Sequence, residues 1–369
     1  MRITCSRDLL LENLQAVLKT VSTKSTMPVL SGIRLEIKAG QKAELASTDM
    51  ELSLRLTMEV KAEGEGALVA PGRLMTDVVR SLPAGEVTLE MDEKEQVLEV
   101  SCGTADFHLN CLPAADFPRL PEMPEDGSFE IDSAPLVSTI NTVARAASRD
   151  ETRPVLTGIL VKFSKEKLKM VATDSYRLSV RETGAESTLK DKKEVIVPRA
   201  SLEELARICG HADSEKISVG IMDGQIIFSA GSVILTSRLI EGQFPNYQQL
   251  LPDEFKHEIK MDRDELQEAV SRISLMAQKN APLRMKFTPG ELTIAAQTPQ
   301  VGEAKEIMPV AFQGEEVEIG FNPEFLREGI DSVSEEQVAL RIISPLRPGL
   351  IKGEGDDFLY LIMPVRLTG

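Results

Sequence analysis

The sequence has no tryptophan and few other aromatic residues, with 3 tyrosines and 12 phenylalanines among 369 residues. Apolar residues nevertheless make up 42% of the chain, an ordinary share for a globular protein. The core must therefore be built mainly from leucine, isoleucine, valine and methionine. The scarcity of aromatic residues among the basic ones also argues against a surface that stacks on nucleic-acid bases.

Disulfides and membrane segments are not expected either. The sequence contains four cysteines, but no two of them form a Cys-x-x-Cys pair, and a chain of this length does not need disulfides for stability. No apolar run approaches the ~18 residues of a membrane span. The first residues lack the apolar segment of a signal peptide. These absences predict a cytoplasmic protein with reduced thiols and no membrane partner.

The common catalytic motifs are absent as well. The three histidines, His108, His211 and His257, are far apart and show no metal-ligand spacing. There is no phosphate loop ending in Gly-Lys-Ser/Thr, no complete dinucleotide-binding glycine pattern and no Gly-x-Ser-x-Gly elbow. We therefore expect no metal, no cofactor and no enzyme of a familiar motif class.

Two aspartates leave an alternative open. Asp49 and Asp174 each follow a strand-like run and a threonine, so an α+β enzyme with an unrecognised site near them is one interpretation. The competing interpretation is structural, because an aspartate at a strand end commonly caps a turn.

What the sequence does contain is a repeat with an offset of about 125 residues. Val-Leu-Ser-Gly-Ile at 29–33 recurs as Val-Leu-Thr-Gly-Ile at 155–159, and Thr48-Asp49 recurs as Thr173-Asp174. Phe117-Pro118 recurs as Phe244-Pro245, and a fainter third copy follows. The repeat predicts three domains, at 1–125, 126–253 and 254–369. Each domain is large enough to bury its own core.

Each predicted domain has the order helix, strands, helix, strands. Opening helices are expected after Ser6, whose side chain can cap the first turn, and after Asp132-Ser133 and Asp262. Second helices are expected beside Pro71-Gly72, at Pro198 and at Asn322-Pro323. This order is typical of an α+β fold with mostly antiparallel strands. Acidic, proline-rich stretches at 120–127 and 250–255 are interpreted as linkers between the domains.

The net charge is -16, which argues against a protein that coats nucleic acid by bulk attraction. Basic residues nevertheless recur at equivalent positions of the predicted helices, and Arg145, Arg149 and Arg153 have i, i+4, i+8 spacing along one of them. A solvated helix face, on a scaffold with no nucleic-acid role, is the plainer interpretation. If the domains are related by pseudo-rotation, however, these charges gather on one surface and would contact phosphates without reading sequence. The candidate DNA contacts are Lys24, Arg73, Arg80, Arg145, Arg149, Arg153, Arg199, Arg272 and Lys279.

The whole chain resembles the bacterial DNA polymerase III beta subunits, the sliding clamps. The most specific segments are Leu-Pro-Ala-Ala-Asp-Phe-Pro at 112–118, Val-Ala-Thr-Asp at 171–174 with Arg177-Leu178, Glu-Gly-Gln-Phe-Pro-Asn-Tyr at 241–247 and Met-Pro-Val-Arg-Leu at 363–367. The resemblance implies three copies of one clamp domain, each with two helices packed on antiparallel sheets. It further implies that two chains join head to tail in a ring, with duplex DNA threaded through it without sequence specificity. In this family an ATP-driven loader opens the ring.

The resemblance also implies a hydrophobic cleft that binds short Gln/Leu/Phe-type peptides. Its partners would be the alpha subunit of DNA polymerase III, the delta subunit of the clamp loader, repair proteins and other proteins with a clamp-binding motif. Here Ser175-Tyr176 stand in place of a Gly-His pair, Gln249 stands in place of an arginine, and Thr368-Gly369 extend the usual end, so peptide preference is the least certain property. The implied cleft residues are Leu156, Thr173, Ser175, Tyr176, Arg177, Leu178, Pro245, Gln249, Leu250, Asn322, Phe325, Leu346, Pro348, Leu361, Met363, Pro364, Val365 and Arg366. Of these, Pro245 and Met363 are the ones most expected to be on the surface, since both lie in turns.

A ring requires an interface between the first domain of one chain and the third domain of the other. By position, Phe107 and Leu109 on a late strand of the first domain would face Leu275 and Met276, which follow the opening helix of the third.

Overall fold

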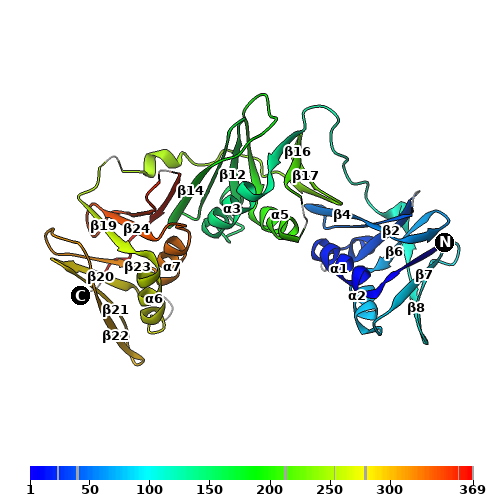
Figure 1. The fold of residues 1–369 in the computed structure, drawn as a ribbon, viewed down its shortest axis with the longest axis horizontal. Coiled ribbons are helices and arrows are strands. Elements are labelled where there is room, and N and C mark those ends of the chain that lie inside the picture. Colours follow the sequence, from blue (N-terminus) through cyan, green and yellow to red (C-terminus); the bar gives the residue numbers. More distant parts are fainter. Residues whose placement is uncertain are drawn as a thin grey trace. The chain divides into compact units, whose positions relative to one another are not determined.

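The computed structural model describes residues 1–22, 25–38, 41–211, 214–252, 254–277, 281–355 and 357–367, and Figure 1 labels its helices and strands. The chain forms two compact units. Unit 1 contains Met1–Ala134, Ser187–Leu189 and Glu204–Leu239, and unit 2 contains Pro135–Glu186, Lys190–Glu203 and Ile240–Gly369. The middle third of the chain therefore contributes strands to both units.

Unit 1 contains two antiparallel sheets. The smaller has the strand order β5-β1-β7-β8-β9, with β1 (Arg2–Ser6), β5 (Lys61–Glu63), β7 (Glu86–Asp92), β8 (Val97–Cys102) and β9 (Ala105–Asn110). The larger has the order β10-β6-β2-β3-β4-β18-β17-β16-β11, with β2 (Gly32–Lys38), β3 (Lys42–Thr48), β4 (Leu52–Glu59), β6 (Gly66–Pro71), β10 (Leu112–Pro113), β11 (Phe129–Asp132), β16 (Lys216–Met222), β17 (Gln225–Ala230) and β18 (Val233–Arg238). Because β4 pairs with β18, with Leu52 opposite Ser237, the larger sheet joins the first and middle thirds of the chain.

Unit 2 repeats this plan. Its larger sheet has the order β15-β12-β13-β14-β26-β25-β24-β19, with β12 (Gly158–Phe163), β13 (Lys167–Thr173), β14 (Arg177–Gly184), β15 (Lys193–Pro198), β19 (His257–Asp262), β24 (Gln337–Ile342), β25 (Gly349–Lys352) and β26 (Phe358–Ile362). Its smaller sheet has the order β22-β21-β20-β23, with β20 (Leu283–Thr288), β21 (Glu291–Thr298), β22 (Gly302–Pro309) and β23 (Val317–Phe321). The pairing of β14 with β26, with Arg177 opposite Ile362, corresponds to the pairing of β4 with β18.

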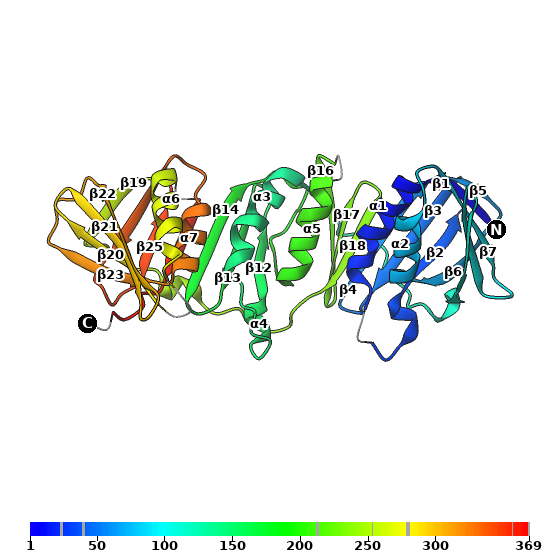
Figure 2. The same cartoon turned by 90° about the horizontal axis from the view of Figure 1, so that it is seen from below.

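The long helices begin where the sequence predicts. The Ser6 hydroxyl accepts a hydrogen bond from the Leu9 amide (3.3 Å) and the Asp262 carboxylate accepts one from the Glu265 amide (2.9 Å), so both residues cap a first turn. In unit 1, α1 and α2 contact each other and the larger sheet, and α6 and α7 are likewise paired in unit 2 (Figure 2). The helices of eight or more residues are α1 (Arg7–Val17), α2 (Gly72–Ser81), α3 (Ser133–Val143), α5 (Arg199–His211), α6 (Arg263–Ser274) and α7 (Pro323–Asp331).

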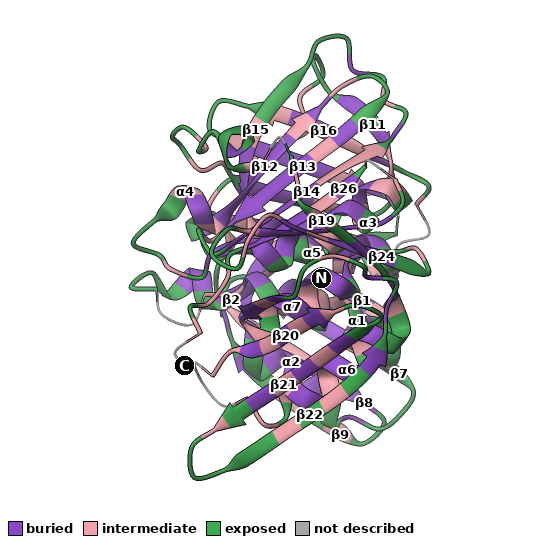
Figure 3. Ribbon diagram, turned by 90° about the vertical axis from the view of Figure 1, so that its left-hand side faces the viewer, coloured by how far each residue is buried: buried purple, intermediate pink, exposed green. Residues whose placement is uncertain are grey.

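The burial pattern follows the strand period. Along β20, Leu283, Met285 and Phe287 are fully buried, while the residues between them are partly exposed. One face of β20 therefore supplies the core, as expected for an antiparallel sheet covered on one side. Figure 3 shows longer buried stretches on β13 and β14, where four consecutive residues of each strand are buried.

The predicted helix through Arg153 is wrong. Helix α3 ends at Val143, and a 3-10 turn, η4 (Ala144–Ala146), holds Arg145. Pro154 then begins the single-turn helix α4 (Pro154–Thr157), and a residue before proline avoids the helical conformation. The Asp150 carboxylate also accepts the Thr152 amide (3.0 Å) and tightens the intervening turn. Arg145, Arg149 and Arg153 therefore do not share one helix face.

The stretches predicted as linkers are packed against the sheets. In unit 2, Phe244, Tyr247 and Leu251 pack on an apolar cluster of the larger sheet that includes Leu178 and Leu361. We call residues 240–252 the second closing segment. It covers a sheet face and is not a free connection.

The corresponding first closing segment, residues 117–122, combines apolar packing with hydrogen bonds to a buried arginine. Phe117 and Leu120 pack on the larger sheet of unit 1, and Arg55 donates to the Pro121 carbonyl (2.7 Å) and to both carboxylate oxygens of Glu122 (2.5 and 3.0 Å). This hydrogen bonding with Arg55 lowers the pKa of Glu122. The first segment is thus held by a buried arginine as well as by apolar packing, whereas the contacts described for the second are apolar.

Candidate functional site

The repeated Thr-Asp pairs form the same turn in both units. The Asp174 carboxylate accepts the backbone N–H groups of the residues two and three positions later, at 2.9 and 3.0 Å. The Asp49 carboxylate does the same at 3.0 and 2.8 Å. The residue between, Met50 or Ser175, has φ of 79° in both turns, a conformation that non-glycine residues seldom adopt. The interpretation of both aspartates as turn caps is confirmed.

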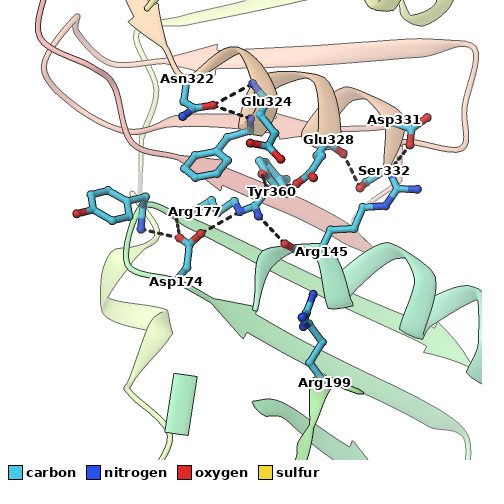
Figure 4. A network of polar contacts seen from close by, with 12 residues as sticks. Arg145, Asp174, Arg177, Arg199, Asn322, Glu324, Glu328, Asp331, Ser332 and Tyr360 are labelled. Atoms are coloured by element: carbon cyan, nitrogen blue, oxygen red, sulfur yellow. Dashed lines mark hydrogen bonds and ion pairs between the residues drawn. The ribbon is translucent and has the colours of Figure 1, made fainter. Parts of the chain in front are cut away.

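The turn in unit 2 is followed by a buried arginine that binds three other elements. Only 9% of the Arg177 side chain is exposed. Its Nε donates to Asp174 (3.1 Å), and its Nη2 donates to the carbonyl oxygen of Arg145 (2.6 Å) in η4. Its Nη1 forms an ion pair with Glu328 on α7 (Figure 4). Arg177 therefore ties β14 to η4 and α7.

An aromatic pair completes the surroundings of Arg177. Its guanidinium lies 4.1 Å from the centre of the Phe325 ring, within range of a cation–π contact. Its Nη1 also lies 3.3 Å from the Tyr360 hydroxyl. Burial raises the pKa of this hydroxyl, so it remains protonated at neutral pH. The position of Phe325 is therefore set by a charged group behind it.

Next to this network is a pocket of about 740 Å³. Six of the predicted cleft residues line it, and the two with the most exposed side chains are Tyr176 (63%) and Met363 (42%). The Met363 amide donates to the Tyr176 carbonyl (2.9 Å), which fixes the two sides of the opening. The complete lining is Tyr176, Ala277, Ala281, Pro282, Asn322, Pro323, Glu324, Phe325, Met363, Pro364 and Val365.

The other predicted cleft residues fall into two groups. Leu156, Thr173, Arg177, Leu178 and Leu361 are buried, and Leu178 and Leu361 belong to the apolar cluster under the second closing segment. They support the surface but do not form it. The rest, on the surface in whole or in part, are Ser175, Pro245, Gln249, Leu250, Leu346, Pro348 and Arg366. The exposure expected for Pro245 and Met363 is confirmed.

Unit 1 has the same backbone frame with different side chains. The Arg238 amide donates to the Glu51 carbonyl (2.8 Å), as the Met363 amide donates to the Tyr176 carbonyl. Here, however, the two side chains form an exposed ion pair, with 3.2 Å between Arg238 Nη1 and Glu51 Oε1. The two units therefore share this backbone hydrogen bond, and only the side chains make the opening in unit 2 apolar.

The candidate DNA contacts lie on or near the helices. In unit 1, a groove of about 710 Å³ is lined by Lys19, Arg73 and Arg80 together with Gln15, Leu18, Val21 and Asp77. Three cationic side chains in one groove suit a phosphate. Lys24 and Lys279 lie outside the described residues.

Most of these cations are already paired with carboxylates. Within the described residues, Arg73 and Arg149 have no ion pair, whereas five others do. The recurrence of basic residues on the helices does not extend to α7, which carries one arginine and three acidic residues. The pairs are Arg80–Asp77, Arg145–Asp331, Arg153–Asp150, Arg199–Glu203, and Arg272 with Glu268 and Glu306.

Comparison with known proteins places this geometry in a family. Three family models match the chain in order: the N-terminal domain of the DNA polymerase III beta subunit at residues 1–121, its central domain at 130–246 and its C-terminal domain at 248–366. The beta sliding clamps of Pseudomonas aeruginosa and Streptomyces coelicolor are 35% and 33% identical to it, with all of both chains covered. Solved clamps from Pseudomonas aeruginosa, bound to griselimycin, and from Bacillus subtilis are 32% and 29% identical, each with a TM-score of 0.92 and full coverage of both chains.

The chain belongs to the DNA polymerase III beta subunit family, the sliding clamps. Its function is therefore that of a processivity factor in DNA replication. The predicted α+β fold of three clamp domains is confirmed. The family is one of non-catalytic processivity factors, which agrees with the use of Asp49 and Asp174 as turn caps.

Two of the residues predicted for the dimer interface lie on an edge strand, where Leu109 is buried in the single chain, and the other two follow helix α6. Phe107 and Leu109 are on β9, the edge strand of the smaller sheet of unit 1. Leu275 follows α6 and is 82% exposed, the highest value among the large apolar residues of the described chain. Met276 comes next and is partly exposed.

Five pocket residues of the clamp escaped prediction. Pro323 and Glu324 directly follow Asn322 in α7, so the predicted helix start was a usable signal. Ala277, Ala281 and Pro282 follow α6, and small residues in a loop carry no such signal.

Among the described residues, no cluster of three or more potential metal ligands is present. The same residues include no helix with the length and apolar character needed to span a bilayer.

Proposed function

We propose that two copies of this clamp join head to tail in a ring that encircles duplex DNA and slides along it. The proposal assigns the chain three domains, at 1–125, 126–253 and 254–369, which the three matched family regions support. It also places the protein in the cytoplasm, where bacterial DNA is replicated, and gives it no catalytic activity of its own. The single observation that carries the proposal is the match to all three clamp domains in order.

The edges of the smaller sheets support the ring. Strands β9 and β22 are each the last strand of their sheet, and an unpaired edge is a template for pairing with another chain. Leu275, the partly exposed Phe107 and the half-exposed Ile307 of β22 (52%) provide apolar surface near these edges. In the proposed dimer, the β9 end of one copy meets the β22 end of the other.

The charge distribution supports a clamp that slides along DNA and does not hold it tightly. With a net charge of -16 the protein repels DNA at long range, but screening over ~8 Å leaves a nearby phosphate sensitive mainly to the local side chains. Arg73, Arg149 and the groove lined by Lys19 and Arg80 supply a limited positive surface. Contacts of this kind hold the backbone without reading bases, so retention depends on the closed ring.

Retention on DNA of different topology tests the ring. A clamp loaded on a nicked circle is expected to stay with the DNA through gel filtration, whereas the same clamp on a linear duplex should slide off its ends. Blocking both ends of the linear DNA with bound protein should restore retention. Equal retention on circular and open linear DNA would show that the clamp grips DNA and does not encircle it.

We propose further that the pocket beside Tyr176 and Met363 binds the peptides of replication partners. The partners of this class are the polymerase III alpha subunit, the loader delta subunit and other proteins with a clamp-binding motif. Three features support peptide capture: a volume of about 740 Å³, a flexible methionine at the opening and a fixed aromatic ring in the wall. Methionine adapts to varied apolar side chains, which suits a site shared by many partners.

Truncation of the methionine tests the pocket. Met363→Ala is expected to weaken binding of a fluorescent Gln/Leu/Phe-type peptide by about 5- to 30-fold, because a buried contact at a small interface is worth about 1–2 kcal/mol. Binding is measured by fluorescence anisotropy. Met222→Ala is the matched control, since Met222 has nearly the same exposure (43% against 42%) but lies on β16 in unit 1. If the two variants bind the peptide with equal affinity, Met363 is not part of the binding site.

A further inference from the structure

Helix α7 connects the peptide pocket to a candidate DNA contact. At its first turn, Asn322 caps the helix by accepting the Glu324 and Phe325 amides (2.9 and 3.2 Å), and both Asn322 and Phe325 line the pocket. At its last residue, the Asp331 carboxylate forms an ion pair with the Arg145 guanidinium (Figure 4). One short helix therefore takes part in both surfaces.

The ion pair at the end of α7 is accessible to ligands, and its arginine compensates an unfavourable negative charge at the end of the helix. The side chains of Arg145 and Asp331 are 44% and 48% exposed, so a ligand can reach the guanidinium. A carboxylate at a helix C-terminus opposes the helix dipole, and α7 has no basic residue in its last turn. Arg145 supplies the missing positive charge from outside the helix.

The backbone of Arg145 is held independently of its side chain. Its carbonyl oxygen accepts from Arg177 Nη2 (2.6 Å), and Arg177 also binds Glu328 in the middle of α7. The side chain can therefore leave Asp331 while the main chain of η4 stays in place. Such a movement takes a positive charge away from the last turn of α7, while the contacts of Arg177 with η4 and with the middle of the helix stay in place.

We propose that DNA phosphates and Asp331 compete for the Arg145 guanidinium, and that α7 transmits the outcome to the peptide pocket. The inference rests on the proposed function, since it assumes that Arg145 faces DNA and that the pocket binds peptide. A helix of nine residues is marginal by itself, so losing the positive charge at its end loosens the helix that positions Phe325. DNA then weakens peptide binding, and by linkage the peptide weakens the Arg145–phosphate contact equally.

The size of the coupling is limited by the ion pair. A pair with about half of each side chain exposed contributes about 0.2–1 kcal/mol, which corresponds to at most about a fivefold change in affinity. We expect the clamp loaded on a nicked circle to bind the fluorescent Gln/Leu/Phe-type peptide about two- to fivefold more weakly than the clamp free of DNA. Peptide affinity is read by anisotropy, and occupancy by the duplex is followed through a second dye on the DNA.

Variants at both ends of the pair locate the effect. Arg145→Gln should bind the peptide about two- to fivefold more weakly without DNA, because the Asp331 carboxylate then opposes the helix dipole without a partner. Asp331→Asn removes that carboxylate, so it should bind the peptide about as the wild type does. DNA should not further weaken peptide binding by either variant. Asp77→Asn is the matched control, because it removes the partner of Arg80 on α2 (2.5 Å) in a helix that does not line the pocket. This variant should keep the wild-type response to DNA. Thermal unfolding of each variant checks that the fold is intact.

Two results would overturn the inference in different ways. If the wild-type clamp binds the peptide equally well when free of DNA and when loaded on a nicked circle, or if Asp331→Asn responds to DNA as the wild type does, the coupling is absent and the proposed function stands. If the wild-type clamp binds no peptide, or is not retained on a nicked circle, the proposed function fails and the inference fails with it.

Discussion

Replacing Arg177 with methionine is expected to destabilise the clamp by about 3 kcal/mol and to abolish measurable peptide binding. Methionine keeps the apolar length of the side chain but removes the charge that Asp174, Glu328 and the carbonyl of Arg145 bind. Removing one partner of a buried ion pair costs about 3–5 kcal/mol. The lower end applies here, because 14% and 20% of the two carboxylate side chains are exposed. Phe325 also loses the cation that sets its position.

Urea unfolding followed by circular dichroism measures the loss of stability, and peptide anisotropy measures the loss of binding. Arg181→Met is the matched control on the same strand, since Arg181 donates a single hydrogen bond to the Thr142 hydroxyl (2.5 Å). Its loss should cost about 1 kcal/mol and leave peptide binding intact. An Arg177→Met variant as stable as Arg181→Met would show that the network contributes little to the fold.

Replacing Leu275 with aspartate is expected to convert the proposed dimer to monomers and to eliminate retention on nicked circles. Leu275 is 82% exposed in the single chain, so burying it in the proposed interface would contribute about 1.5–3 kcal/mol. An aspartate there loses that contribution and adds an unpaired buried charge. The dimer dissociation constant should rise more than 30-fold. Analytical ultracentrifugation over a concentration series measures the change.

A second exposed leucine in unit 2 provides the control. Leu346 is 68% exposed and was predicted for the peptide cleft, not for the dimer interface. Leu346→Asp should therefore keep the dimer over the same concentration series. Dissociation of both variants to the same extent would mean that added charge, and not the position of Leu275, is responsible.

The local structure of the repeat could be predicted because it depends on neighbours in sequence. The turn caps at Asp49 and Asp174 and the helix caps at Ser6 and Asp262 need only residues two or three positions away. The helix through Arg153 could not be excluded in the same way, because the spacing of its arginines competed with the effect of Pro154 on the residue before it. Periodicity alone does not decide between these effects.

The polar network of the site depends on residues far apart in sequence. Glu328 is 151 residues from Arg177, and the Tyr360 hydroxyl is 183 residues away. Arg272 similarly pairs with Glu306, 34 residues later. Such partners follow from strand pairing and helix packing, and so the sequence indicated where cations stand but not which of them are neutralised.

The repeated frame has a consequence for how partners share the clamp. The bond from the Met363 amide to the Tyr176 carbonyl has its counterpart between Arg238 and Glu51, yet only the former carries an apolar opening. A ring of two chains would then have two apolar pockets, although it contains four copies of this backbone hydrogen bond. Under the proposed function, partner proteins that bind this pocket would exclude one another, and a few surface side chains would limit each ring to two bound partners at a time.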